Sequence, residues 1–107
     1  MRYGYCLNTA LAEGIMNLDD VTTVTLREAS EHTTSAERAD NLRDVQEFGE
    51  RALKTLETID RSSLEPDAKN AVETAIRHMR NVQRAVHPEG GWHDAREARQ
   101  AIAGLLG

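Results

Sequence analysis

The stretch that decides the predicted fold runs from Thr34 to His87 and contains two segments with a helical pattern, TSAERADNLRDVQEFGERALKTLETID (34–60) and PDAKNAVETAIRHMRNVQRAVH (66–87). In both segments, apolar or small residues recur at steps of mostly three and four, the spacing of a packed helix face. Gly49 on this face indicates either the close approach of a neighbouring helix or a tolerated defect. The positions on the face are Leu42, Val45, Gly49, Ala52, Leu56 and Ile59, and then Val72, Ala75, Ile76, Met79, Val82 and Val86.

The ends of the two segments carry helix start and stop signals. Thr34 with Glu37 has the form of a capping box, and Pro66 suits the first position of a helix. Pro88 and the glycine pair 90–91 predict a stop and a hinge after His87. Because the turn over residues 61–65 is short, the two helices must run antiparallel. We therefore expect a helical hairpin over 34–60 and 66–87.

The N-terminal third is less regular. Asn8 is expected to cap a helix over 9–18, which Asp19 and Asp20 end. The β-branched run 21–25 favours an extended connector, with a two-stranded ribbon against residues 3–7 as the alternative. One or two helical turns over 26–32 are expected to follow.

The C-terminal end is predicted to add one short helix over 94–106, capped by Asp94 and held against the hairpin by Trp92. The chain has 107 residues, which corresponds to a single domain over 1–107. The predicted fold is all-α, a three- or four-helix bundle built on the long antiparallel hairpin.

Composition limits the partners of this domain. Aromatic residues make up only 4% of the chain, so the core must consist of slender aliphatic side chains. Burial of apolar surface against a second copy would compensate for the small apolar area that such a core buries. We therefore expect a homo-oligomer. Its predicted interface consists of Leu42, Val45, Phe48, Leu56, Val72 and Met79.

Charge and cysteine content narrow the function classes further. The net charge of −5 argues against long-range attraction of nucleic acid by the whole molecule. The single cysteine, Cys6, permits no disulfide within the chain. Because no apolar run approaches a membrane span and acidic residues interrupt the N-terminal region, a cytoplasmic protein without membrane contact is expected.

The second segment also carries a cationic stripe, made of Lys69, Arg77, Arg80, Arg84 and His87. Arginines on one helix face suit the capture of a phosphate, so Arg77, Arg80 and Arg84 are candidate ligand-binding residues for a nucleotide or another phosphate ligand. The competing interpretation is that these groups pair with the acidic first helix or remain solvated.

Arg80-Asn81 is followed by five residues and then His87-Pro88, an arrangement that resembles the HEPN superfamily. The resemblance implies a helical bundle and a metal-independent endoribonuclease whose site is completed across a dimer, with Arg80, Asn81 and His87 as candidate catalytic residues. In such chemistry a histidine moves a proton and an arginine stabilises charge on the phosphate. The alternative role for His87 is to interact with the free carbonyl groups at the end of the helix.

A metal site is not expected, because His78, His87 and His93 lack ligand spacing, and no cofactor is expected. The favoured function is a small interaction or regulatory module, not an enzyme, that holds itself or a protein partner on its helix faces. The alternatives are a HEPN-like ribonuclease or toxin-type protein acting on RNA, and a helical oligomer of phage or bacterial-defence type that captures a nucleotide.

Overall fold

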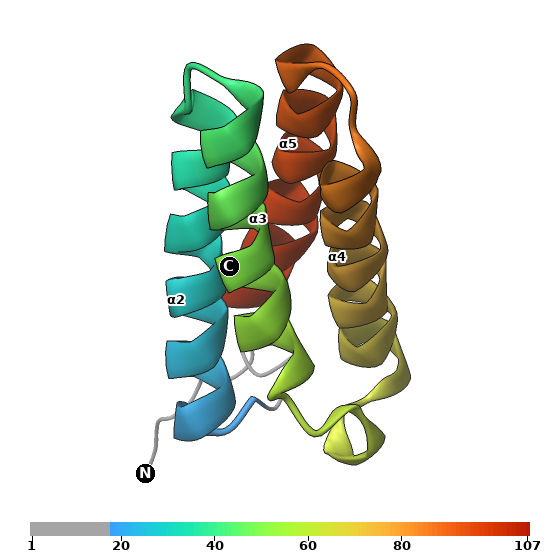
Figure 1. The fold of residues 1–107 in the computed structure, drawn as a ribbon. Helices are drawn as coiled ribbons and strands as arrows, with labels where there is room; N and C mark the ends of the chain where they lie inside the picture. The colour runs from blue at the N-terminus through green and yellow to red at the C-terminus, as the bar shows by residue number, and fades with distance from the viewer. Residues whose placement is uncertain (1–17) are drawn as a thin grey trace, which may run out of the picture.

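The computed structural model describes residues 18–107, and this part of the chain is an all-α four-helix bundle (Figure 1). Successive helices run in alternating directions, and within the described range there is no strand. The predictions for Cys6, Asn8, strand 3–7 and all of helix 9–18 except its last residue fall on residues 1–17, outside the described residues. The elements are α2 (Asp20–Arg38), α3 (Leu42–Glu57), the short 3-10 helix η3 (Arg61–Ser63), α4 (Pro66–Arg84) and α5 (Pro88–Leu106).

The four helices form a ring in which each packs mainly against two neighbours, and α3 and α5 also make a smaller contact across it. The most extensive contacts join α2 to α3 and α4 to α5, and α2 to α5 closes the ring. The pair α3–α4, from which the hairpin was predicted, is the least extensive of the four neighbouring pairs. The structure therefore does not single out that pair as the unit on which the rest is built.

Helix α2 replaces the predicted connector over 21–25, and this prediction was wrong. Asp19 caps the helix by accepting a bond from the Thr22 backbone N–H at 2.7 Å, which also lowers the pKa of the Asp19 carboxyl. The hydroxyl of Thr25 donates to the carbonyl of Val21 inside the helix at 2.8 Å. The helix buries Leu26, Ala29, Thr33 and Ala36. Burial of this face and the cap outweigh the local preference of β-branched residues for strands.

The predicted helix 34–60 is in fact the end of one helix and all of the next. Thr34 is not a cap, because it lies inside α2 and its hydroxyl donates to the Ser30 carbonyl at 2.9 Å. The chain turns after Arg38, and α3 starts from Asn41, whose side chain accepts from the Asp44 N–H at 2.9 Å. The Asn41 side chain supplies the same acceptor as a Thr cap would, immediately before a helix that is shorter than predicted.

The apolar face predicted for the two segments, which we call the apolar seam, forms the core of the bundle. Of the first segment only Leu42 is half-buried rather than buried, and of the second only Val86 is exposed, at 77%. Four of the six residues predicted to form an interface between molecules have no exposed surface at all, and they pack within the chain. These four are Val45, Leu56, Val72 and Met79, while Leu42 and Phe48 are half-buried.

Two glycines allow helices to approach closely. A Cβ at Gly49 would lie 2.7 Å from Val82 Cγ1, and a Cβ at Gly91 would lie 2.6 Å from Val45 Cγ1. Gly49 thus serves the close approach of α3 and α4. The glycine pair 90–91 is not a hinge, because α5 begins at Pro88 and includes both residues. Helix 94–106 was predicted six residues too short at its start.

Trp92 lies within α5 rather than before it, and it ties the helix to the turn between α2 and α3. Its indole Nε1 donates to the carbonyl of Ala39, between α2 and α3, at 2.8 Å. The indole also packs against the buried core. The predicted role of Trp92 in holding the last helix in place agrees with this contact.

Candidate functional site

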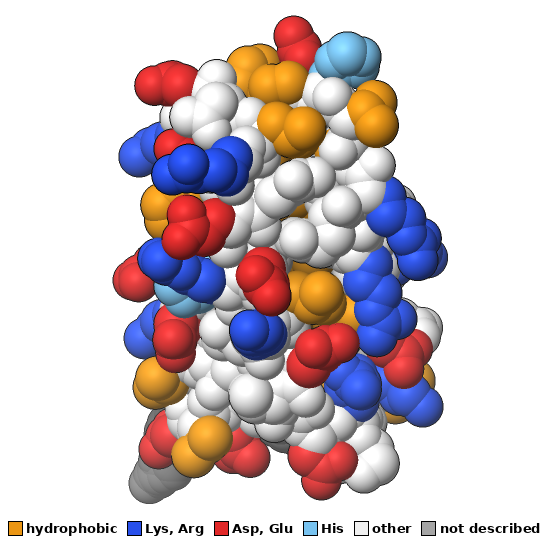
Figure 2. Space-filling model, viewed as in Figure 1, with side chains coloured by type: hydrophobic (Ala, Val, Ile, Leu, Met, Phe, Trp, Pro, Cys, Tyr) orange, Lys and Arg blue, Asp and Glu red, His pale blue; other side chains and the backbone are white. Residues whose placement is uncertain are grey.

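The cationic residues of α4 are exposed along one edge of the molecule, where Figure 2 shows Lys and Arg side chains gathered on the α4 side. Lys69, Arg77, Arg80 and Arg84 belong to the helix. His87 does not, because α4 ends at Arg84 and His87 occupies the N-cap position of α5. The stripe therefore contains four cationic residues on one helix, not five.

The end of α4 is fixed by a side chain from α3. Gln46 Nε2 lies 3.3, 3.3 and 3.0 Å from the carbonyl oxygens of Val82, Gln83 and Ala85, to which it donates. In return, Gln83 Nε2 donates to the Gln46 carbonyl at 2.9 Å. The capping role predicted for His87 was thus wrong, because Gln46 satisfies these carbonyl groups.

A depression of about 230 Å³ lies where η3 meets α4. Its lining is dominated by three arginines, one of which comes from η3 and two from α4. Asp60 fixes the η3 turn by accepting bonds from the backbone N–H of Ser62 at 3.2 Å and from its hydroxyl at 2.6 Å. We call this the α4 depression; its lining residues are Arg61, Glu73, Ile76, Arg77 and Arg80.

One nitrogen of a residue that lines the depression is left without a partner. Arg61 Nη1 is buried, and among the described residues it has no hydrogen-bond partner. A buried donor without an acceptor is costly, about 1–3 kcal/mol for an ordinary group and more for a charged one. Arg61 therefore keeps donor capacity that the described residues do not use.

The charge of the α4 depression favours an anion. Three guanidinium groups face one carboxylate, Glu73, which leaves two positive charges among the lining residues. Arg80 also pairs with Glu57 of α3 through Nη2 and Oε2 at 3.3 Å. These two side chains are 57% and 42% exposed, so the pair contributes at most about 1 kcal/mol and an incoming anion can compete with it.

The predicted ligand-binding residues fall into two groups. Arg77 and Arg80 line the α4 depression, whereas Arg84 is exposed nearer the end of the helix and is not part of the lining. Arg61 was missed, because residues 61–65 were interpreted only as a turn. The sequence signal for Arg61 is weak, since it depends on η3 folding back onto α4.

The three candidate catalytic residues do not share one helix face. Arg80 bonds to Glu57, Asn81 is half-buried, and His87 lies beyond the end of α4 with an exposed side chain that makes no cap bond. The expectation that Arg80 and His87 lie seven residues apart on a continuous helix was therefore wrong. The ribonuclease activity itself stays a prediction.

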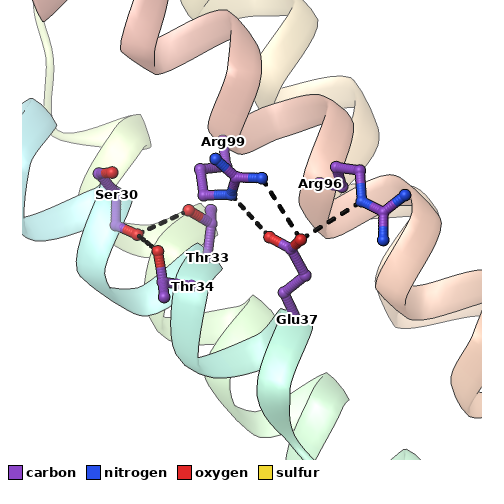
Figure 3. A network of polar contacts seen from close by, with 6 residues as sticks. All are labelled: Ser30, Thr33, Thr34, Glu37, Arg96 and Arg99. Carbon is purple, nitrogen blue, oxygen red and sulfur yellow. Dashed lines mark hydrogen bonds and ion pairs between the residues drawn. The ribbon is translucent and has the colours of Figure 1, made fainter.

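A second polar cluster joins α2 to α5 (Figure 3). Glu37 accepts from Arg99 Nε at 2.7 Å, from Arg99 Nη2 at 3.4 Å and from Arg96 Nε at 3.3 Å. The Arg99 bond, followed by that from Arg96, holds the pKa of the Glu37 carboxyl below its usual value, and the same contact raises the pKa of Arg99. Sequence reasoning gave Glu37 only a capping role, because nothing local indicates a partner sixty residues away.

His78, one of the three histidines considered for a metal, pairs with a carboxylate of α5. His78 Nδ1 lies 2.8 Å from Asp94 Oδ1, and both side chains are about four-fifths buried between α4 and α5. Asp94 is thus an interhelical partner rather than the predicted cap. In residues 18–107, no three His, Cys, Asp or Glu side chains are arranged to hold a metal ion.

Comparison with known proteins adds no family. No family model matches the chain, and no curated protein or solved structure is detectably similar to it. None of the helices in the described range is both long and apolar enough to cross a membrane.

Proposed function

We propose that this protein is an interaction module that binds a phosphorylated segment of a protein partner in the α4 depression. The observation that carries the proposal is that Arg61, Arg77 and Arg80 line one depression, and that Arg61 has a buried Nη1 with no hydrogen-bond partner among the described residues. Guanidinium groups match phosphate oxygens because their N–H donors form a planar fork. Clusters of arginine are a recurring means of recognising phosphorylated peptides.

The size of the depression supports a single phosphate group carried by a larger partner. Its volume of about 230 Å³ is below the roughly 300–1,000 Å³ that is usual for sites of complete small molecules. The net charge of −5 disfavours nucleic acid, whose binding depends on many phosphate contacts at once. A peptide that presents one phosphoserine or phosphothreonine fits both observations.

The apolar seam supports the same proposal by its absence from the surface. Its central residues are buried in the core of one chain, so they are not available to a partner. A partner that binds this module must then contact residues outside the seam, and the arginines of the α4 depression are among these. Self-association stays a prediction, and light scattering of the purified protein tests it directly.

The test is fluorescence anisotropy with pools of labelled peptides that differ only in whether a central serine is phosphorylated. We expect binding of phosphorylated pools and a loss of affinity of about tenfold in Arg77→Ala, the size expected for one charge-assisted contact. Arg84→Ala is the matched control, because it removes an exposed arginine of the same helix that does not line the depression.

Three results would overturn the proposal. The first is equal binding of phosphorylated and unphosphorylated pools. The second is an equal effect of Arg77→Ala and Arg84→Ala, which would indicate only long-range attraction. The third is cleavage of RNA by the wild type that His87→Ala abolishes, which would support the HEPN-like ribonuclease instead.

A further inference from the structure

A second depression lies between α2 and α5, across the bundle from the Arg80–Glu57 pair. Its volume is about 410 Å³, and five side chains from the two helices line it. The Glu37 cluster of Figure 3 forms part of its wall. We call it the α2–α5 depression; its lining residues are Thr34, Glu37, Arg38, Arg96 and Arg99.

The lining is positively charged even though it contains a carboxylate. Three guanidinium groups against one carboxylate leave two positive charges. Glu37 is only 17% exposed and, with its pKa lowered, it stays ionised near neutral pH. It therefore acts as a fixed anchor for the arginines.

Glu37 uses only part of the donor capacity around it. Each guanidinium carries about five N–H donors, and the Glu37 bonds take one from Arg96 and two from Arg99. Arg38, at the end of α2, is exposed and makes none of the bonds to Glu37. Because Glu37 restrains two of the three arginines, less side-chain entropy is lost when an anion binds.

The remaining wall indicates the rest of the ligand. Among the residues that line the depression there is no aromatic or aliphatic side chain, so a nucleobase would find no apolar surface against which to pack. The Thr34 hydroxyl donates to the Ser30 carbonyl, and its oxygen is left as an acceptor for a hydroxyl of the ligand. The volume lies within the usual range for small-molecule sites.

We propose that the α2–α5 depression binds a small, hydrophilic phosphate monoester of the sugar phosphate class, with its phosphate on Arg38, Arg96 and Arg99. This site is separate from the α4 depression and does not depend on the function proposed for it. The two could fail or succeed independently.

Isothermal titration calorimetry with ribose 5-phosphate tests the proposal, with ribose, inorganic phosphate and AMP as comparison probes. The decisive variant is Arg38→Ala, which removes a lining charge and leaves the Glu37 bonds in place. Arg27→Ala is the matched control: it removes the same charge from an exposed position of α2, about 16 Å away along the helix.

We expect ribose 5-phosphate to bind wild type more tightly than inorganic phosphate does, and ribose not to bind. Arg38→Ala should weaken binding by about fivefold or more, and Arg27→Ala by less than about twofold. The melting temperature of Arg38→Ala should match that of the control. Arg77→Ala, which removes a charge from the α4 depression, should leave binding of ribose 5-phosphate unchanged.

Absence of ribose 5-phosphate binding to wild type would overturn the proposal. So would equal effects of Arg38→Ala and Arg27→Ala, because general charge attraction would then be sufficient. Loss of binding in Arg77→Ala alone would assign the ligand to the α4 depression. Preference for AMP over ribose 5-phosphate would contradict the ligand class.

Discussion

The two arginine-rich regions of the bundle contain the same residue types in different states. On the α2–α5 side, Glu37 is 17% exposed and bonds to two arginines, whereas on the α3–α4 side the Arg80–Glu57 pair is largely exposed. Next to that exposed pair, Arg61 Nη1 is buried without a described partner. The difference indicates that the Glu37 cluster stabilises the fold, whereas the exposed Arg80–Glu57 pair contributes little to stability.

The largest effect on the free energy of unfolding should come from removing the charge of Glu37. Glu37→Gln weakens charge-assisted bonds to Arg96 and Arg99 in a mostly buried setting, so we expect a loss of about 2 kcal/mol in the free energy of unfolding. Urea unfolding measures it. The matched control is Glu57→Gln, and equal losses in the two variants would remove the distinction between the two sides.

The same comparison predicts a pH dependence. Because the pKa of Glu37 is lower in the folded state than its ordinary 4.5, its contribution is present above pH 4.5 and disappears as the pH falls through the folded-state pKa. The stability difference between wild type and Glu37→Gln should therefore shrink on acidification below about pH 4.5. A difference that stays constant down to pH 2 would contradict the assigned role of the ionised carboxylate.

A smaller effect is expected at the contact of α3 with α4. Gly49→Ala gains helix propensity of about 1 kcal/mol but places a Cβ 2.7 Å from Val82 Cγ1, and such overpacking costs about 1–3 kcal/mol. We expect a net loss of about 1 kcal/mol in thermal melts. Gly104→Ala is the control, because a Cβ there meets nothing within 4 Å and should stabilise by up to about 1 kcal/mol.

The smallest stability effect should accompany a gain in binding. Glu57→Gln removes an exposed ion pair, which should change the stability by less than about 1 kcal/mol. It also releases Arg80 toward the α4 depression, so affinity for phosphorylated peptides should rise by a few-fold. Anisotropy titrations measure this, and a fall in affinity would show that Glu57 positions Arg80 rather than competes for it.

The sequence pattern was sufficient for the fold class and most of the core, because buried positions of a helix repeat with a fixed spacing. The helix ends were predicted less well, since several depend on distant partners. Gln46 bonds to the last carbonyl groups of α4 from another helix, and Gly91 lies inside α5 where a Cβ would collide with Val45 of α3. The run 21–25 has strand propensity, but its cap at Asp19 and its buried face determine a helix.

The candidate sites were predicted in part. Arg77 and Arg80 could be found because they lie on one helix and helical spacing brings them together. Arg61 and Glu37 could not, since Arg61 reaches the site through η3 and Glu37 meets arginines some sixty residues later in the chain. Spacing within one helix carries information about neighbours, whereas contacts between elements require the three-dimensional arrangement.

The bond from Trp92 to Ala39 gives the protein a built-in optical reporter. Trp92 is the chain's single tryptophan, and its half-buried indole connects α5 with the corner between α2 and α3. Its emission should shift to longer wavelength when either side detaches, while far-ultraviolet circular dichroism follows all helices together. Coincident transitions by both signals would indicate all-or-none unfolding, and an earlier fluorescence change would reveal that this corner opens first.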